Sequence, residues 1–343
     1  MTRYSYRTNF LITAVFGIFL LVLSGCFSPW TGEDTTLTIG FGGNNSRSAL
    51  PWASADPAVL NDLLYNVQLS GPDGAKHVTA KGGSVIKISV TPGIWNIEVK
   101  AYYRAESFLY AAGSGSAEAK AGQSNSATVS MVKKYYEVGD TGPGGGTIFY
   151  VADGREGRPF GFTVEGYTGA VGSFASYTAH YLEVAPNDSG SGLWASSTGT
   201  PLPNAHIEGI SAIDINVNTN YNVFTHPINQ IGNGRKDTML IVAYLGTVVS
   251  PIQAGRAAQL AAAETAGGKN NWFLPSSGEL NLIYTSTYLA GMSGIYWSST
   301  QRNNLTGNQG LAFYQDFTAG GTYNGRDNGT KGISYNVRAI RAF

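Results

Sequence analysis

Side chains that could carry out catalysis are few and widely spaced in this 343-residue chain. Three of its histidines, His180, His206 and His226, lie far apart, and none belongs to the H-E-x-x-H spacing with which a helix binds zinc. The sequence also lacks the G-x-S-x-G turn that exposes a serine nucleophile. Neither a zinc hydrolase nor a serine hydrolase is therefore expected.

The acidic side chains offer no clearer reaction centre. A glycoside hydrolase needs two carboxylates flanking one bond, but Glu183 falls in a strand-like run and Glu279 fits a helix cap. Calcium needs six to eight oxygen ligands, of which Asn187, Asp188 and Asp214 supply only a few. We therefore predict no catalytic residue, no metal and no cofactor; an enzyme with an unrecognised site stays open as the lesser alternative.

Binding chemistry is better represented, in the region between Trp297 and Val337. Tyrosine rings there supply rigid contact area and asparagine amides supply adaptable hydrogen bonds, a combination typical of ligand-binding loops. A solvated loop rich in glycine and asparagine is the plain alternative. The candidate ligand-binding residues are Arg302, Asn303, Asn304, Asn308, Tyr314, Tyr323, Asn324, Arg326 and Asn328.

Cys26 is the single cysteine of the chain. Arg3 and Arg7 precede an apolar run over 10–22, and small residues follow before the cysteine. A basic start and a short apolar run predict a secretory signal peptide, because a membrane-spanning helix needs about 20 apolar residues. The box Leu23-Ser24-Gly25-Cys26 resembles that of bacterial lipoproteins, which implies cleavage before Cys26 and a lipid on its sulfur.

This anchor sets the expected location. A lone cysteine cannot form an internal disulfide, and a lipid on its sulfur removes the free thiol. Several acyl chains bind a membrane far more firmly than one. We expect a protein anchored in the cell envelope by Cys26, in the outer membrane and exposed at the surface. Only 13% of residues are charged and no basic run occurs, so no nucleic-acid partner is expected.

The first half of the chain is expected to be all β. Alternating apolar residues predict strands over 36–41, 65–69, 85–90, 94–99 and 127–132. Thr91-Pro92-Gly93 separates two of these runs and predicts a hairpin. A short helix is possible near 57–64. Short strands at this spacing predict a β-sandwich, and the turn followed by a strand loosely resembles immunoglobulin-like or prealbumin-like modules.

The second half mixes strands with helices. Apolar spacing predicts a helix over 235–245, and Ser250-Pro251 predicts the start of an alanine-rich helix that runs to Ala266. Ser276 and Glu279 form an S-x-x-E capping box that opens a third helix. The glycine run over 139–146 precedes a strand and not a helix, so it predicts a tight linker and not a phosphate loop.

Five blocks of this half resemble one family in order: 139–151, 181–188, 231–234, 271–284, and 296–299 together with the ending 337–343. The central block, Trp272-Phe273-Leu274-Pro275-Ser276 followed by Glu279-Leu280-Asn281, is the most specific. The family is the DUF1566-type, or Lcl C-terminal, domain. The resemblance implies an α+β, C-type lectin-like fold whose first and last strands pair.

The expected organisation is a signal peptide over 1–25, a lipidated tether over 26–34, a β-sandwich over 35–133, a glycine-rich linker over 134–146 and the DUF1566-type domain over 147–343. We expect a surface lipoprotein whose C-terminal domain binds a macromolecular or glycan ligand in adhesion or recognition. The alternative is a structural envelope protein that contacts another envelope protein.

Overall fold

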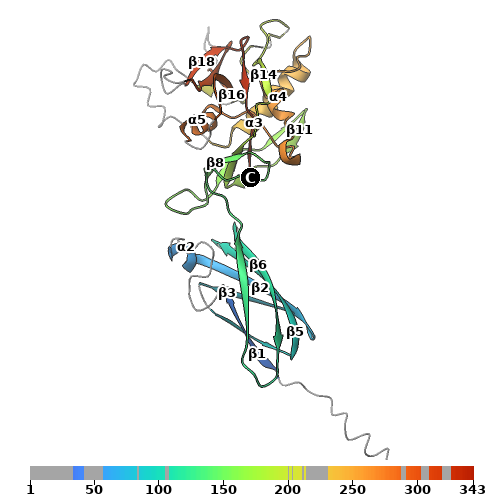
Figure 1. The fold of residues 1–343 in the computed structure, drawn as a ribbon. Helices are drawn as coiled ribbons and strands as arrows, with labels where there is room; N and C mark the ends of the chain where they lie inside the picture. The colour runs from blue at the N-terminus through green and yellow to red at the C-terminus, as the bar shows by residue number, and fades with distance from the viewer. Residues whose placement is uncertain are drawn as a thin grey trace, which may run out of the picture. The chain divides into compact units, whose positions relative to one another are not determined.

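The computed structural model describes residues 34–41, 57–82, 85–104, 108–199, 201–202, 204–210, 212–213, 231–286, 291–302, 309–318 and 326–343. The chain forms two compact units, which we call unit 1, up to Tyr135, and unit 2, from Tyr136 to Phe343 (Figure 1). The predicted signal peptide and Cys26 lie outside the described residues. Within the described ranges, no helix is long and apolar enough to cross a membrane.

The described part of unit 1 forms a seven-stranded sheet with a short helix. Its elements are β1 (Thr35–Phe41), α2 (Pro57–Asp62), β2 (Leu63–Gly71), β3 (Gly74–Lys81), β4 (Ile86–Val90), β5 (Gly93–Tyr103), β6 (Phe108–Ala119) and β7 (Asn125–Lys133). The strand order is β3-β2-β5-β6-β7-β1-β4. The β1–β7 pair is parallel and the other pairs are antiparallel.

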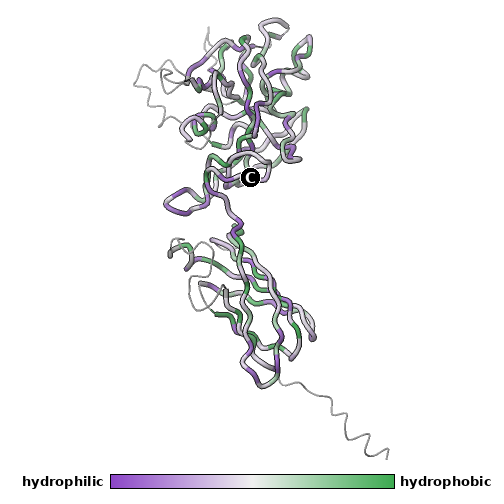
Figure 2. Tube along the Cα trace, in the orientation of Figure 1, coloured by the Kyte–Doolittle hydropathy of each residue, from purple (hydrophilic) through white to green (hydrophobic). Residues whose placement is uncertain are grey.

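This sheet nearly closes on itself, which corrects the expectation of two stacked sheets. The side chain of Lys76 in β3 donates a hydrogen bond of 3.0 Å to the carbonyl of Ser89 in β4. The two edge strands of the sheet therefore come within side-chain reach of each other. Apolar and polar residues alternate along the strands (Figure 2). The apolar set, including Trp95, Ile97 and Val99, is buried, so one face of the curved sheet encloses the core.

The predicted hairpin at Thr91-Pro92-Gly93 is wrong. Strand β4 pairs with β1, whereas β5 pairs with β2 and β6, so the chain crosses the core at this turn. Alternation shows which side chains of a strand are buried, but it does not show which strand lies beside it. The expected short helix is confirmed as α2, and β3 and β6 are additional strands.

Unit 2 is built from short strands. They are β8 (Thr147–Val151), β9 (Phe162–Val164), β10 (Tyr167–Gly169), β11 (Gly172–Phe174), β12 (Tyr177–Ala179), β13 (Tyr181–Val184), β14 (Gly190–Leu193), β15 (Ala212–Ile213), β16 (Ile295–Arg302), β17 (Leu311–Asp316), β18 (Arg326–Thr330), β19 (Ser334–Val337) and β20 (Ile340–Ala342). The larger sheet has the order β14-β19-β16-β17-β18, with β15 beside β16, and a smaller one has the order β20-β13-β8.

The α+β, C-type lectin-like expectation for this unit is wrong. Strands make up 47% of the protein and helices 15%, so the structure is mostly β. The first and last strands of the unit, β8 and β20, do not pair with each other; both flank β13. The blocks at 139–151, 181–188 and 296–299 contain strands, but their sequences do not specify the order in which those strands pair.

The helices of unit 2 lie partly where the sequence predicts them. Helix α3 (Gly234–Ala243) continues as a π-helix over Tyr244–Val248, and α5 (Ser277–Thr285) begins at the predicted Ser276 cap. Helix α4 (Ala257–Ala262) begins seven residues after Ser250, because Gln253 holds the preceding loop. The side-chain oxygen of Gln253 accepts a hydrogen bond from the Ser196 amide, and the backbone carbonyl of Gln253 accepts one from the Gln259 side chain.

Candidate functional site

The block that contains Trp272 and Glu279 forms the scaffold of unit 2. The buried Glu279 carboxylate accepts hydrogen bonds from the amides of Gly232 (2.8 Å) and Ser276 (2.7 Å), and burial raises its pKa. One side chain thus joins the segment before α3 to the start of α5. The capping box is confirmed, and Glu279 has a structural role.

A second buried carboxylate explains the glycine run. Glu183 is fully buried and accepts from the amides of Gly144 (2.9 Å) and Gly146 (2.8 Å), while Arg341 donates to it at 2.9 Å. A Cβ on Gly146 would collide with the carbonyl of Val184. Backbone amides that converge in this way form an anion-binding concavity. Here the anion is the protein's own carboxylate, and the run is packed into unit 2.

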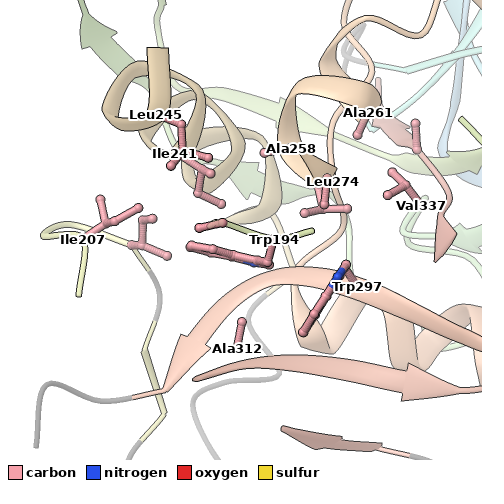
Figure 3. Packing of buried hydrophobic residues seen from close by; sticks show 14 of the residues in the cluster. Trp194, Ile207, Ile241, Leu245, Ala258, Ala261, Leu274, Trp297, Ala312 and Val337 are labelled. Carbon is pink, nitrogen blue, oxygen red and sulfur yellow. The ribbon is translucent and has the colours of Figure 1, made fainter. Parts of the chain in front are cut away.

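Both carboxylates support the core on which the larger sheet rests. Trp194 and Trp297 are fully buried beneath α3 and α4, and Leu274 from the scaffold block packs beside them (Figure 3). The indole of Trp297 donates to the carbonyl of Gly192 at 3.1 Å, which fixes its orientation. At the edge of this core, Tyr314 and Tyr335 are only partly buried and reach solvent.

We name the candidate site the tyrosine rim, after Tyr314, Tyr335 and Asp327. The Tyr335 ring lies 4.5 Å from that of Trp297, and the Tyr314 ring lies 5.2 Å from that of Tyr335, edge to face. Asp327 lies directly opposite Tyr314 in the β17–β18 ladder, so the two side chains share a face. Both tyrosines are partly exposed and Asp327 is exposed.

The hydroxyl groups of the rim stay protonated over a wide pH range. Burial raises the pKa of Tyr314 to about 12, and the charge of Asp327 and a hydrogen bond to it act in the same direction. Burial and the Asp327 charge also raise the pKa of Tyr335. The rim therefore offers ring surface, two hydroxyl groups and one carboxylate at a single edge, which is suited to a ligand with both apolar faces and hydroxyl groups.

The structure separates the ligand-binding residues predicted from the sequence. Arg302 and Asn328 are joined by a hydrogen bond of 3.4 Å. Asn328 lies opposite Phe313, so it points to the other face of the sheet from Tyr314. Only the backbone of Arg326 is described, at the start of β18. The remaining members, Asn303, Asn304, Asn308, Tyr323 and Asn324, lie outside the described residues.

Lys331 is a buried cation that the sequence did not reveal. Its ammonium group donates to the carbonyl of Ala205 (2.9 Å) and to Gln301 (3.2 Å), and it lies 4.3 Å from the centre of the Trp194 ring. Burial lowers its pKa to about 7. Gln301 also accepts from the amide of Ile207 at 3.1 Å. These contacts occupy the ammonium group, so Lys331 fixes the 204–210 segment to the sheet.

The other residues considered for chemistry have structural partners. Asp188 bonds to Arg338 (2.6 Å) and Tyr296 (3.1 Å), which leaves it poorly placed for calcium. Ser298 donates to the carbonyl of Phe313 at 2.8 Å. Among the described residues, no three His, Cys, Asp or Glu side chains cluster in a way that would hold a metal ion. Asp214 and His226 lie outside those residues.

Comparison with known proteins adds no relative: no family model and no curated protein matches the chain. The resemblance to DUF1566-type domains and to bacterial lipoproteins therefore stays a prediction that rests on the residues quoted above.

Proposed function

We propose that this protein is a lipid-anchored surface protein of the cell envelope whose unit 2 recognises a macromolecular or glycan ligand at the tyrosine rim. The observation that supports this proposal is the rim itself. Tyr335 is held against the fully buried Trp297, so its ring is presented to solvent without a large loss of side-chain freedom on binding. Rigid aromatic anchors beside polar groups are typical of recognition surfaces.

Lipid attachment at Cys26 rests on the Leu-Ser-Gly-Cys box. Cells that express the protein and grow on a labelled fatty acid should incorporate label into the wild type and not into Cys26→Ala. Label that persists in Cys26→Ala would place the anchor elsewhere. This experiment is independent of the rim, so the two parts of the proposal stand or fall separately.

The rim is tested by binding of the full chain to a glycan array and to immobilised matrix proteins. Tyr314→Phe removes a hydroxyl group and Asp327→Asn removes a negative charge, each with an expected loss of about 0.5–1.5 kcal/mol in binding free energy. Asp62→Asn is the control, because this exposed carboxylate belongs to unit 1. Equal effects of Asp327→Asn and Asp62→Asn would contradict the assignment, as would binding by the wild type to neither class of probe.

A further inference from the structure

The outer face of unit 1 carries a second candidate binding surface. An open hollow of about 1110 Å³ lies over β3, β2, β5, β6 and β7. Strand β6 has short side chains along its floor, at Ala112, Ser114 and Ser116, between the longer side chains of Glu98 on β5 and Val132 on β7. The hollow therefore follows from the choice of residues on neighbouring strands.

The strand register aligns five polar side chains across this hollow. His77 lies opposite Gln68, Gln68 opposite Glu98, Glu98 opposite Ser114, and Ser114 opposite Ser130. We call this set the polar row; all five residues are exposed. Because neighbouring strands are about 4.8 Å apart, the row runs about 19 Å perpendicular to the strands. It offers an imidazole, an amide, a carboxylate and two hydroxyl groups at a regular spacing.

The charge of the face argues against a strongly anionic ligand. Glu98 forms an ion pair with Lys100 at 3.0 Å, and Lys76 pairs with Asp73 at 3.0 Å. Lys134 adds one positive charge at the margin. Nucleic-acid surfaces instead gather many unpaired Lys and Arg side chains. The polar row is therefore matched to a ligand that is close to neutral.

The backbone takes little part in recognition on this face. Strands β2, β5 and β6 are each paired on both sides, so their amides and carbonyls are occupied in the ladder. An extended peptide gains most of its affinity from backbone pairing at a sheet edge, which this face does not offer. A polyhydroxyl ligand suits it better, because every hydroxyl group both donates and accepts.

We infer that the polar row is a binding site for a linear, neutral polysaccharide that lies across the strands. An extended β-1,4-linked chain repeats at close to the strand spacing, so successive sugars meet successive strands. Val132, 58% exposed at the margin of the hollow, supplies an apolar contact for a sugar ring. This site is separate from the tyrosine rim and does not depend on the function proposed for unit 2.

The test is calorimetric titration of the full chain in detergent with cellohexaose and chitohexaose as extended probes, and maltohexaose as a coiled one. The wild type should bind at least one extended hexasaccharide and bind maltohexaose more weakly. Ser130→Trp fills the end of the polar row and should weaken binding about tenfold or more. Ser126→Trp is the matched control: an exposed serine on the same face of the same strand, outside the hollow.

Both serines are exposed, so both variants should keep the wild-type unfolding temperature. Gln68→Ala should weaken binding without adding bulk. Weaker binding in Gln68→Ala and Ser130→Trp would place the site in unit 1, apart from the rim, whose residues belong to unit 2. The inference is overturned if the wild type binds neither extended probe, if maltohexaose binds equally well, or if Ser126→Trp and Ser130→Trp weaken binding to the same extent.

Discussion

Buried Lys331 makes the stability of unit 2 depend on pH in a direction that can be measured. Its pKa falls from 10.5 to about 7 in the folded protein because burial disfavours the charged form. Between these values the unfolded chain binds more protons than the folded one. The free energy of unfolding should therefore rise as pH increases from 7 towards 10.5, and this gain is lost as pH falls back through 7.

The size of the effect follows from the shift. One pKa unit corresponds to about 1.36 kcal/mol. Integrated from pH 7 to pH 9, the Lys331 contribution amounts to about 2 kcal/mol. His206 does not complicate this window, because burial lowers its pKa from 6.5 and its ring is mostly neutral above pH 7. Lys331→Met keeps most of the side-chain volume and removes the titrating group.

Urea unfolding of the wild type and Lys331→Met at pH 7, 8 and 9 provides the measurement. The difference in unfolding free energy between the two proteins should change by about 2 kcal/mol in favour of the wild type as pH rises. Lys269→Met, at a partly exposed position, is the control for removal of a lysine side chain. Parallel curves for the wild type and Lys331→Met would refute the reasoning.

Three further perturbations test the scaffold and the rim. Gly146→Ala should lower the free energy of unfolding by about 1–3 kcal/mol, because the new Cβ collides with the backbone of Val184. Gly246→Ala is the control: its new Cβ meets no atom within 4 Å, so thermal unfolding should be nearly unchanged. Glu279→Ala leaves two buried amides without their acceptor, so it should lower the free energy of unfolding by about 2–4 kcal/mol in urea. Glu208→Ala, at an exposed position, is the control and should lower it by less than about 0.5 kcal/mol. Because the folded pKa of Tyr314 is raised to about 12, its contribution to stability should be present below pH 10 and lost as pH rises towards 12. An alkaline titration followed by phenolate absorbance should show one fewer phenolate forming near pH 12 in Tyr314→Phe than in the wild type.

Local chemistry in the sequence predicts local structure well. The Ser276 and Glu279 pair defines a helix start, and alternating apolar residues define β1, β2, β4, β5 and β7. Strand β6 escaped prediction because its second half, Gly113 to Ala119, is made of small residues with weak strand preference. Gly113 is required there for packing, because a Cβ would collide with the carbonyl of Ser130 in β7.

Pairing between distant strands is what the sequence does not encode locally. Asp327 becomes part of the rim only because the β17–β18 register sets it opposite Tyr314, and the polar row exists only through four separate registers. No sequence pattern marks Lys331 as buried, because its burial depends on Trp194 and Gln301 lying against it in the fold. Each of these features depends on which strands are neighbours, a property that propensity and spacing leave open.

The two buried carboxylates explain why small residues occur in the glycine run and at the S-x-x-E box. Glu183 and Glu279 are each satisfied mainly by backbone amides, from Gly144 and Gly146 in one case and Gly232 and Ser276 in the other. Such amides must approach closely, which restricts the positions to small residues. The glycine-rich and S-x-x-E blocks are thus the parts of the chain least free to vary for binding. The two proposed binding surfaces use other residues: the tyrosine rim lies at an edge of the core of unit 2, and the polar row crosses the exposed face of the sheet of unit 1.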